Sequence, residues 1–114
     1  MSITIELENN QGPALAFQMF GKDGSISTGT EIEAPGGIKL TLTEMRECRS
    51  IGVASVLAFV VDASVAIDIG LFSAWLYDQV KSPNSVKIKI KEREVHFDKG
   101  EITKAIEREI EYSE

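Results

Sequence analysis

Several residue types that support common kinds of stability or chemistry are scarce in this sequence. The 114 residues include one cysteine and one histidine. Cys48 alone cannot form an internal disulfide, which suits a reducing compartment. Any chemistry that depends on histidine would have to use His96, and one histidine is a poor start for a zinc site. The composition therefore argues against a disulfide-rich domain and against a histidine-based metal centre.

Basic charge is also in short supply. The chain has 12 basic and 18 acidic side chains, for a net charge of −6. A general nucleic-acid-binding protein needs a basic surface to neutralise phosphates, so we expect no nucleic-acid partner. A negative net charge does allow a basic protein partner, through electrostatic steering and complementarity.

The remaining composition is that of an ordinary folded domain. Apolar residues make up 43% and charged residues 26%, and a chain of this length can bury a core without disulfides or a metal. No internal repeat or linker interrupts residues 1–114, so we expect a single domain. The segment 1–6 lacks the basic start and apolar run of a secretory signal, which predicts a cytoplasmic protein.

The first forty residues carry the period of β-strands. Ile3, Ile5 and Leu7 alternate with polar residues, and similar alternation recurs in later segments separated by turn-forming clusters. The pattern predicts an N-terminal antiparallel β-meander with strands near residues 3–8, 15–20, 25–33 and 38–43. The spacing of Thr41 and Glu44 fits a capping box, and residues 44–49 have helical propensity.

The middle of the chain, residues 51–77, is apolar almost throughout. Asp62 is positioned to cap a helix whose apolar residues recur at helical spacing on one face: Val65, Ile69, Phe72, Leu76 and Val80. Residues 51–61 suit a buried strand or a helix, and we favour a helix. The sequence therefore predicts a buried central apolar helix or helix pair.

The same apolar run is long enough to cross a bilayer. It contains Asp62 and Asp68, however, each of which costs about 2.5–3.5 kcal/mol near the bilayer centre. Strand-rich polar segments on both sides also fit a buried core better, so we do not expect a membrane span.

The last third predicts a hairpin followed by a helix. Residues 86–91 alternate strictly between aliphatic side chains and lysines, and residues 94–98 form the expected hairpin partner. Asp98 and Glu101 have capping-box spacing, which predicts a helix over residues 99–112. Its apolar stripe is narrow, so this helix should lie on the surface.

Three residue types could carry chemistry, and each has a simpler explanation. Asp62 and Asp68 interrupt an apolar segment, and buried carboxyl groups can act as general acids, but capping and a polar seam explain them as well. His96 lies between Glu94 and Asp98 and is read as an exposed strand histidine. Cys48 lacks an evident base and pocket and is read as structural.

The charged stripes at the end of the chain favour binding over catalysis. Lys87, Lys89 and Lys91 share one strand face, but no aromatic residues interleave with them. Lysines on an edge strand commonly prevent unwanted strand pairing. The candidate partner-binding residues are instead four acids that crowd the end of the last helix, where the helix dipole disfavours them: Glu107, Glu109, Glu111 and Glu114.

The layout from Asp62 to Asp98, an apolar helix ending in Ser73-Ala74-Trp75-Leu76-Tyr77 followed by a short hairpin, is similar to small adaptor domains attached to bacterial conflict-system proteins. The resemblance implies no site residue.

We expect an α+β fold and a non-enzymatic protein-binding module, most concretely an immunity or antitoxin protein that neutralises a basic toxin, with no cofactor or metal. The alternatives are a structural or assembly subunit, such as a phage component or homo-oligomeric scaffold, and a small enzyme using Asp68 or His96.

Overall fold

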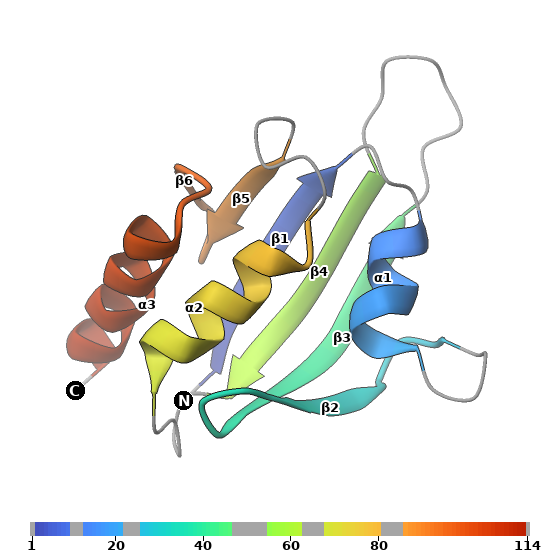
Figure 1. Cartoon of the computed structure of the whole chain (residues 1–114), viewed down its shortest axis with the longest axis horizontal. Helices are drawn as coiled ribbons and strands as arrows, with labels where there is room; N and C mark the ends of the chain where they lie inside the picture. Colours follow the sequence, from blue (N-terminus) through green and yellow to red (C-terminus); the bar gives the residue numbers. More distant parts are fainter. Residues whose placement is uncertain are drawn as a thin grey trace.

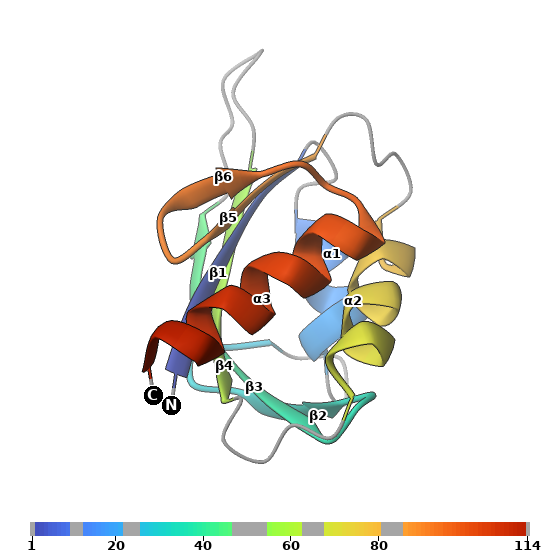
Figure 2. The same ribbon diagram turned by 90° about the vertical axis from the view of Figure 1, so that its left-hand side faces the viewer.

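One antiparallel sheet forms the framework, with two helices on one face and the C-terminal helix alongside one end of the sheet (Figures 1 and 2). The computed structural model describes residues 2–9, 13–21, 26–46, 55–62, 68–80 and 86–113. Within these ranges six strands are ordered β2-β3-β4-β1-β5-β6, and each neighbouring pair is antiparallel. The expected α+β class is therefore confirmed.

The elements follow one another along the chain as β1 (Ser2–Asn9), α1 (Pro13–Phe20), β2 (Glu31–Ala34), β3 (Ile38–Arg46), β4 (Ser55–Asp62), α2 (Ile69–Asp78), β5 (Lys87–Ile90), β6 (Arg93–Val95) and α3 (Lys99–Ser113).

The first strand lies inside the sheet. The predicted alternation is confirmed, because Ile3, Ile5 and Leu7 are buried in the core. However, β1 pairs with β4 on one side and β5 on the other. The meander therefore consists of β2, β3 and β4 alone, and the N-terminal strand closes the gap between the two halves of the sheet.

The second predicted strand, at residues 15–20, is wrong, because this segment forms helix α1. Its buried side chains are Leu15, Ala16, Met19 and Phe20, which recur at helical rather than alternating spacing. Pro13 occupies the first helical position, where its missing N–H costs nothing. A segment this short and this apolar fits both periods, so the pattern could not separate them.

The predicted helix at residues 51–61 is also wrong over its described part, where Ser55–Asp62 forms β4. This strand has hydrogen-bonded neighbours on both sides and is buried along most of its length. Such strands read as continuous apolar runs, without alternation. The predicted helical start at Glu44 fails similarly, since β3 continues through a bulge to Arg46.

Helix α2 begins later than predicted. Asp68, not Asp62, is its N-cap: Asp68 Oδ1 accepts a hydrogen bond from the Leu71 N–H at 3.0 Å. Phe72 and Leu76 are fully buried as expected, but Leu71 is 51% exposed. The helix therefore lies on the sheet with one side in solvent, which corrects the expectation of a buried central helix.

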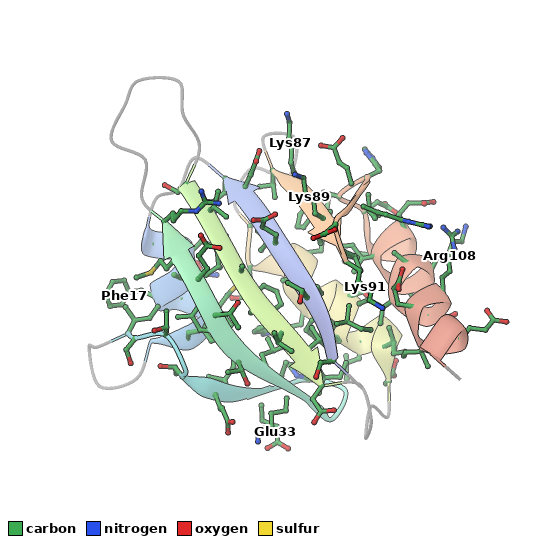
Figure 3. The ribbon with its side chains drawn as sticks, turned by 180° about the vertical axis from the view of Figure 1, so that it is seen from behind. Phe17, Glu33, Lys87, Lys89, Lys91 and Arg108 are labelled. Carbon is green, nitrogen blue, oxygen red and sulfur yellow. The ribbon has the colours of Figure 1, made fainter. Side chains whose placement is uncertain are left out.

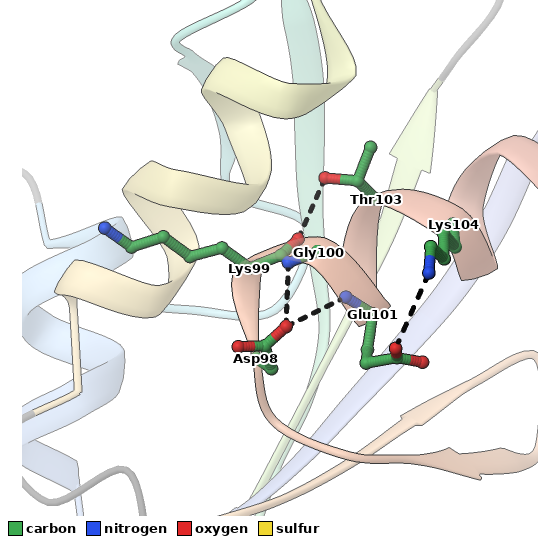
Figure 4. A network of polar contacts seen from close by, with 6 residues as sticks. All are labelled: Asp98, Lys99, Gly100, Glu101, Thr103 and Lys104. Carbon is green, nitrogen blue, oxygen red and sulfur yellow. Dashed lines mark hydrogen bonds and ion pairs between the residues drawn. The ribbon is translucent and has the colours of Figure 1, made fainter.

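The C-terminal hairpin and helix are confirmed. Asp98 caps α3, because its Oδ2 accepts hydrogen bonds from the N–H groups of Gly100 and Glu101 at 3.0 and 3.2 Å (Figure 4). The Tyr77 ring stacks on Phe97 with centroids 5.3 Å apart, where α2 meets the segment leading into α3. No helix in the described ranges is long and apolar enough to cross a membrane.

Candidate functional site

The sheet surface opposite α1 and α2 carries most of the polar strand residues, and we call it the open face (Figure 3). Strand side chains alternate between the two surfaces of a sheet. The odd-numbered residues of β1 enter the core, so Thr4, Glu6 and Glu8 project from the open face. Residues that pair directly across neighbouring strands lie on the same surface of the sheet, so the strand pairing also shows which residues of the other strands are on the open face.

A charged row crosses the open face. Glu44, Ala58 and Glu6 lie opposite one another on β3, β4 and β1. Arg46 pairs with Glu44 through its Nε, and its terminal nitrogen lies 3.9 Å from a Glu6 oxygen. Because the residue between the two carboxylates is alanine, we infer that there is room for the arginine to reach across β4.

The lysine stripe continues these rows and does not lie on an edge. Lys87 is opposite Glu8, and Lys89 has Glu6 on one side and Glu94 on the other. The prediction of edge-strand lysines is therefore wrong, because β5 lies between β1 and β6. Opposite charges directly across a sheet stabilise its register. The lysines thus complement carboxylates of this chain.

The strand β2, which lies at the end of the sheet farthest from β6, carries acidic side chains. β2 has β3 as its only neighbour in the sheet of the described residues. Its Glu31 and Glu33 lie on the open face opposite Thr41 and Lys39. With Ile32 and Lys39, these glutamates line a shallow pocket of about 240 Å³. Among the described residues, this edge combines negative side chains with a strand that is paired on one side only.

Lys39 forms an ion pair with one of these two glutamates. Its Nζ lies 3.0 Å from a Glu31 oxygen. The hydrogen bond to Glu31 and the charge of that carboxylate raise the pKa of Lys39 above its ordinary value of 10.5, with a smaller contribution from Asp62. Glu31 is thus partly neutralised, whereas Glu33 has no ion pair within the described part of the chain.

The four glutamates predicted to bind a partner do not form one surface. Glu107 and Glu111 are exposed one turn apart on α3. The side chain of Glu109 is only 12% exposed, and its carboxylate lies 3.6 Å from Lys91 Nζ. Glu114 lies outside the described residues. Arg108, next to Glu107 in the sequence, is also exposed (Figure 3), so this helix end carries mixed charge.

The net negative charge belongs to the first part of the chain. Residues 1–85 carry ten acidic and five basic side chains, whereas residues 86–114 carry eight acidic and seven basic ones. The first part supplies β1 to β4, α1 and α2, and the second supplies β5, β6 and α3. The acidic excess therefore lies in the part of the sequence that contains β2, whereas the part that contains β5, β6 and α3 is nearly neutral.

His96 is exposed as predicted, but it follows β6, which ends at Val95, and does not lie within a strand. It lines two shallow pockets, of about 350 and 210 Å³, which also share Glu94 and Val95. Lys104 and Arg108 approach the second pocket from α3. No hydrogen bond orients the His96 imidazole within the described residues, and no group of three metal-ligating side chains occurs among them.

The two aspartates that interrupt the apolar run have different structural roles. Asp68 is exposed and caps α2, so a capping role accounts for it. Asp62 ends β4 opposite Lys39 and is half-buried, where its charge contributes to the raised pKa of Lys39. Cys48 lies outside the described residues.

These features define an α+β protein whose sheet has one uncovered face and an acidic outer strand. No family model matches the sequence, and neither a characterised protein nor a solved structure matches it significantly.

The acidic edge was not recognisable as a site from the sequence. Residues 25–33 carried a strand signal, but nothing local shows that this strand is outermost. That position follows from β1 pairing with β4 and β5, which leaves β2 at one end. Charge counted over separate parts of the chain was the one available signal, since it places the acidic excess before residue 86.

Proposed function

We propose that this chain is a non-enzymatic protein-binding module that neutralises a basic protein, in the manner of an immunity protein or antitoxin. The observation that carries the proposal is the uneven distribution of charge. The acidic excess lies in residues 1–85, the part of the chain that includes β2 and its exposed Glu31 and Glu33.

A basic protein is the partner that this distribution favours. Complementary charge speeds association and selects against partners of the same sign. Nucleic acid is a disfavoured partner, because the lysines on β5 that could contact phosphates face carboxylates of β1 and β6 within the sheet. Their positive charge is therefore already balanced on the open face.

Affinity capture tests the proposal. A lysate of the cells that produce the protein is passed over the immobilised chain at low salt. The bound proteins are then eluted at high salt and identified by mass spectrometry. We expect a cationic protein that binds at low salt, is released at high salt, and loses its toxic or enzymatic effect when the chain is added. Recovery of no cationic protein at low salt, or of one whose effect is unchanged by the chain, would contradict the proposal.

A further inference from the structure

The backbone of β2 has one side directed away from the sheet. The Leu42 N–H donates to the Thr30 carbonyl at 2.9 Å, and the Gly29 N–H donates to the Leu42 carbonyl at 2.7 Å. The backbone carbonyl of Thr30 therefore points toward β3. Backbone groups of a strand alternate in direction with a period of two residues, so those of Ile32 also point toward β3. The backbone N–H and C=O groups of Glu31 and Glu33 consequently point away from β3.

The side chains of the same two residues add a charge pattern to these backbone groups. Glu31 and Glu33 project on the open face, and Ile32 projects on the face that carries the helices. A strand that paired with β2 would therefore meet carboxylates on one face and an aliphatic side chain on the other.

We propose that β2 binds an extended segment of the partner as an additional strand, with lysine or arginine side chains opposite Glu31 and Glu33. In this recognition mode, main-chain hydrogen bonds provide affinity and alternate side chains provide specificity. The positive charge of the segment rests on the proposed function, whereas the position of binding rests on the geometry of β2.

A second copy of this chain fits the same edge less well. If two β2 strands paired across a two-fold axis, their outward-directed residues would bring glutamates of one copy opposite glutamates of the other. Pairing β2 with the β6 edge of another copy would place Glu94 on the same face as Glu31 and Glu33. Like charges directly opposite on neighbouring strands are destabilising, so a basic segment from a different protein is favoured.

Nuclear magnetic resonance with a synthetic peptide tests the site. The probe is a blocked peptide of sequence Lys-Thr-Lys-Val-Lys-Thr-Lys, added to the isotopically labelled chain. We expect the amide signals of Glu31 and Glu33 to shift and their hydrogen exchange to slow. The double variant Glu31→Gln with Glu33→Gln should weaken binding by roughly tenfold or more. The matched control, Glu107→Gln with Glu111→Gln, removes the same charge from α3 and should bind as the unmodified chain does.

Backbone pairing is separated from simple charge attraction by a second peptide. This peptide has the same side chains but N-methyl groups on alternate residues, so the edge that faces β2 cannot donate hydrogen bonds. We expect it to bind much more weakly than the parent peptide. Equal binding of the two peptides, shifts confined to α3, or a salt-independent dimer that protects the Glu31 amide would each overturn the proposal. If the captured cationic partner binds the Glu31→Gln, Glu33→Gln variant normally, the β2 site is wrong while the proposed function stands.

Discussion

At the scale of single residues, the turn between β2 and β3 shows most clearly how one side chain can be excluded. Gly36 has a φ of +91°, which L-residues with a side chain rarely adopt. A Cβ atom there would lie 2.2 Å from the Asp68 carbonyl oxygen. The Gly36 carbonyl also accepts a hydrogen bond from the Asp68 N–H at 3.1 Å. This glycine therefore joins the acidic edge to the start of α2.

We expect Gly36→Ala to destabilise the protein more than Gly29→Ala. Gly29 has nearly the same φ, +90°, but a Cβ there would meet nothing within 4 Å. Gly29→Ala should cost about 1–2 kcal/mol from backbone conformation alone. Gly36→Ala should cost at least about 1 kcal/mol more, because it adds the clash with Asp68. Urea unfolding of both variants measures the difference, and equal losses would show that the contact does not matter.

The titration of Lys39 is a second test at this scale. Its raised pKa means that the Lys39–Glu31 pair stabilises the fold below pH 10.5, and that this contribution disappears as the pH rises through the folded-state pKa. We expect Glu31→Gln to return the pKa of Lys39 toward its ordinary value, whereas Glu33→Gln should leave it raised. A titration of the Lys39 side chain followed by nuclear magnetic resonance distinguishes these results. Equal effects of the two variants would refute the assignment of Glu31 as the main cause.

At the scale of elements, the sequence predicted those segments whose local pattern was unambiguous. The β5–β6 hairpin and α3 were correct, because strict alternation and the Asp98 cap are local signals. Residues 15–20 and 55–61 were assigned to the wrong element. Both are apolar without a clear alternation, and their type is decided by neighbouring strands and helices outside any local window.

The turn of the C-terminal hairpin offers a prediction about local strain. Lys91 and Glu92 have φ values of 53° and 71°, a geometry that usually favours Asn-Gly. We expect Glu92→Gly to stabilise the protein by about 0.5–1 kcal/mol, since relief of the left-handed strain exceeds the entropic cost of glycine. Glu92→Ala keeps the Cβ atom and should bring no such gain. Chemical denaturation measures both variants, and an equal gain would attribute the effect to charge instead.

At the scale of the whole molecule, strand order determines which residues become available to a partner. The sequence located the acidic patch on the last helix, where Glu107 and Glu111 are indeed exposed but Glu109 pairs with Lys91. The insertion of β1 between β4 and β5 leaves β2 outermost. No local pattern encodes that insertion, because it depends on pairings between segments far apart in the sequence. The candidate site therefore became apparent only in the assembled sheet.

The most direct test of this account compares two acidic surfaces against the same captured basic partner. The dissociation constant is measured for the unmodified chain, for the Glu31→Gln, Glu33→Gln variant and for the Glu107→Gln, Glu111→Gln variant, each at two salt concentrations. We predict that the β2 variant binds roughly tenfold or more weakly and loses part of the salt dependence, while the α3 variant remains close to the unmodified chain. Weaker binding by the α3 variant, with normal binding by the β2 variant, would contradict the account.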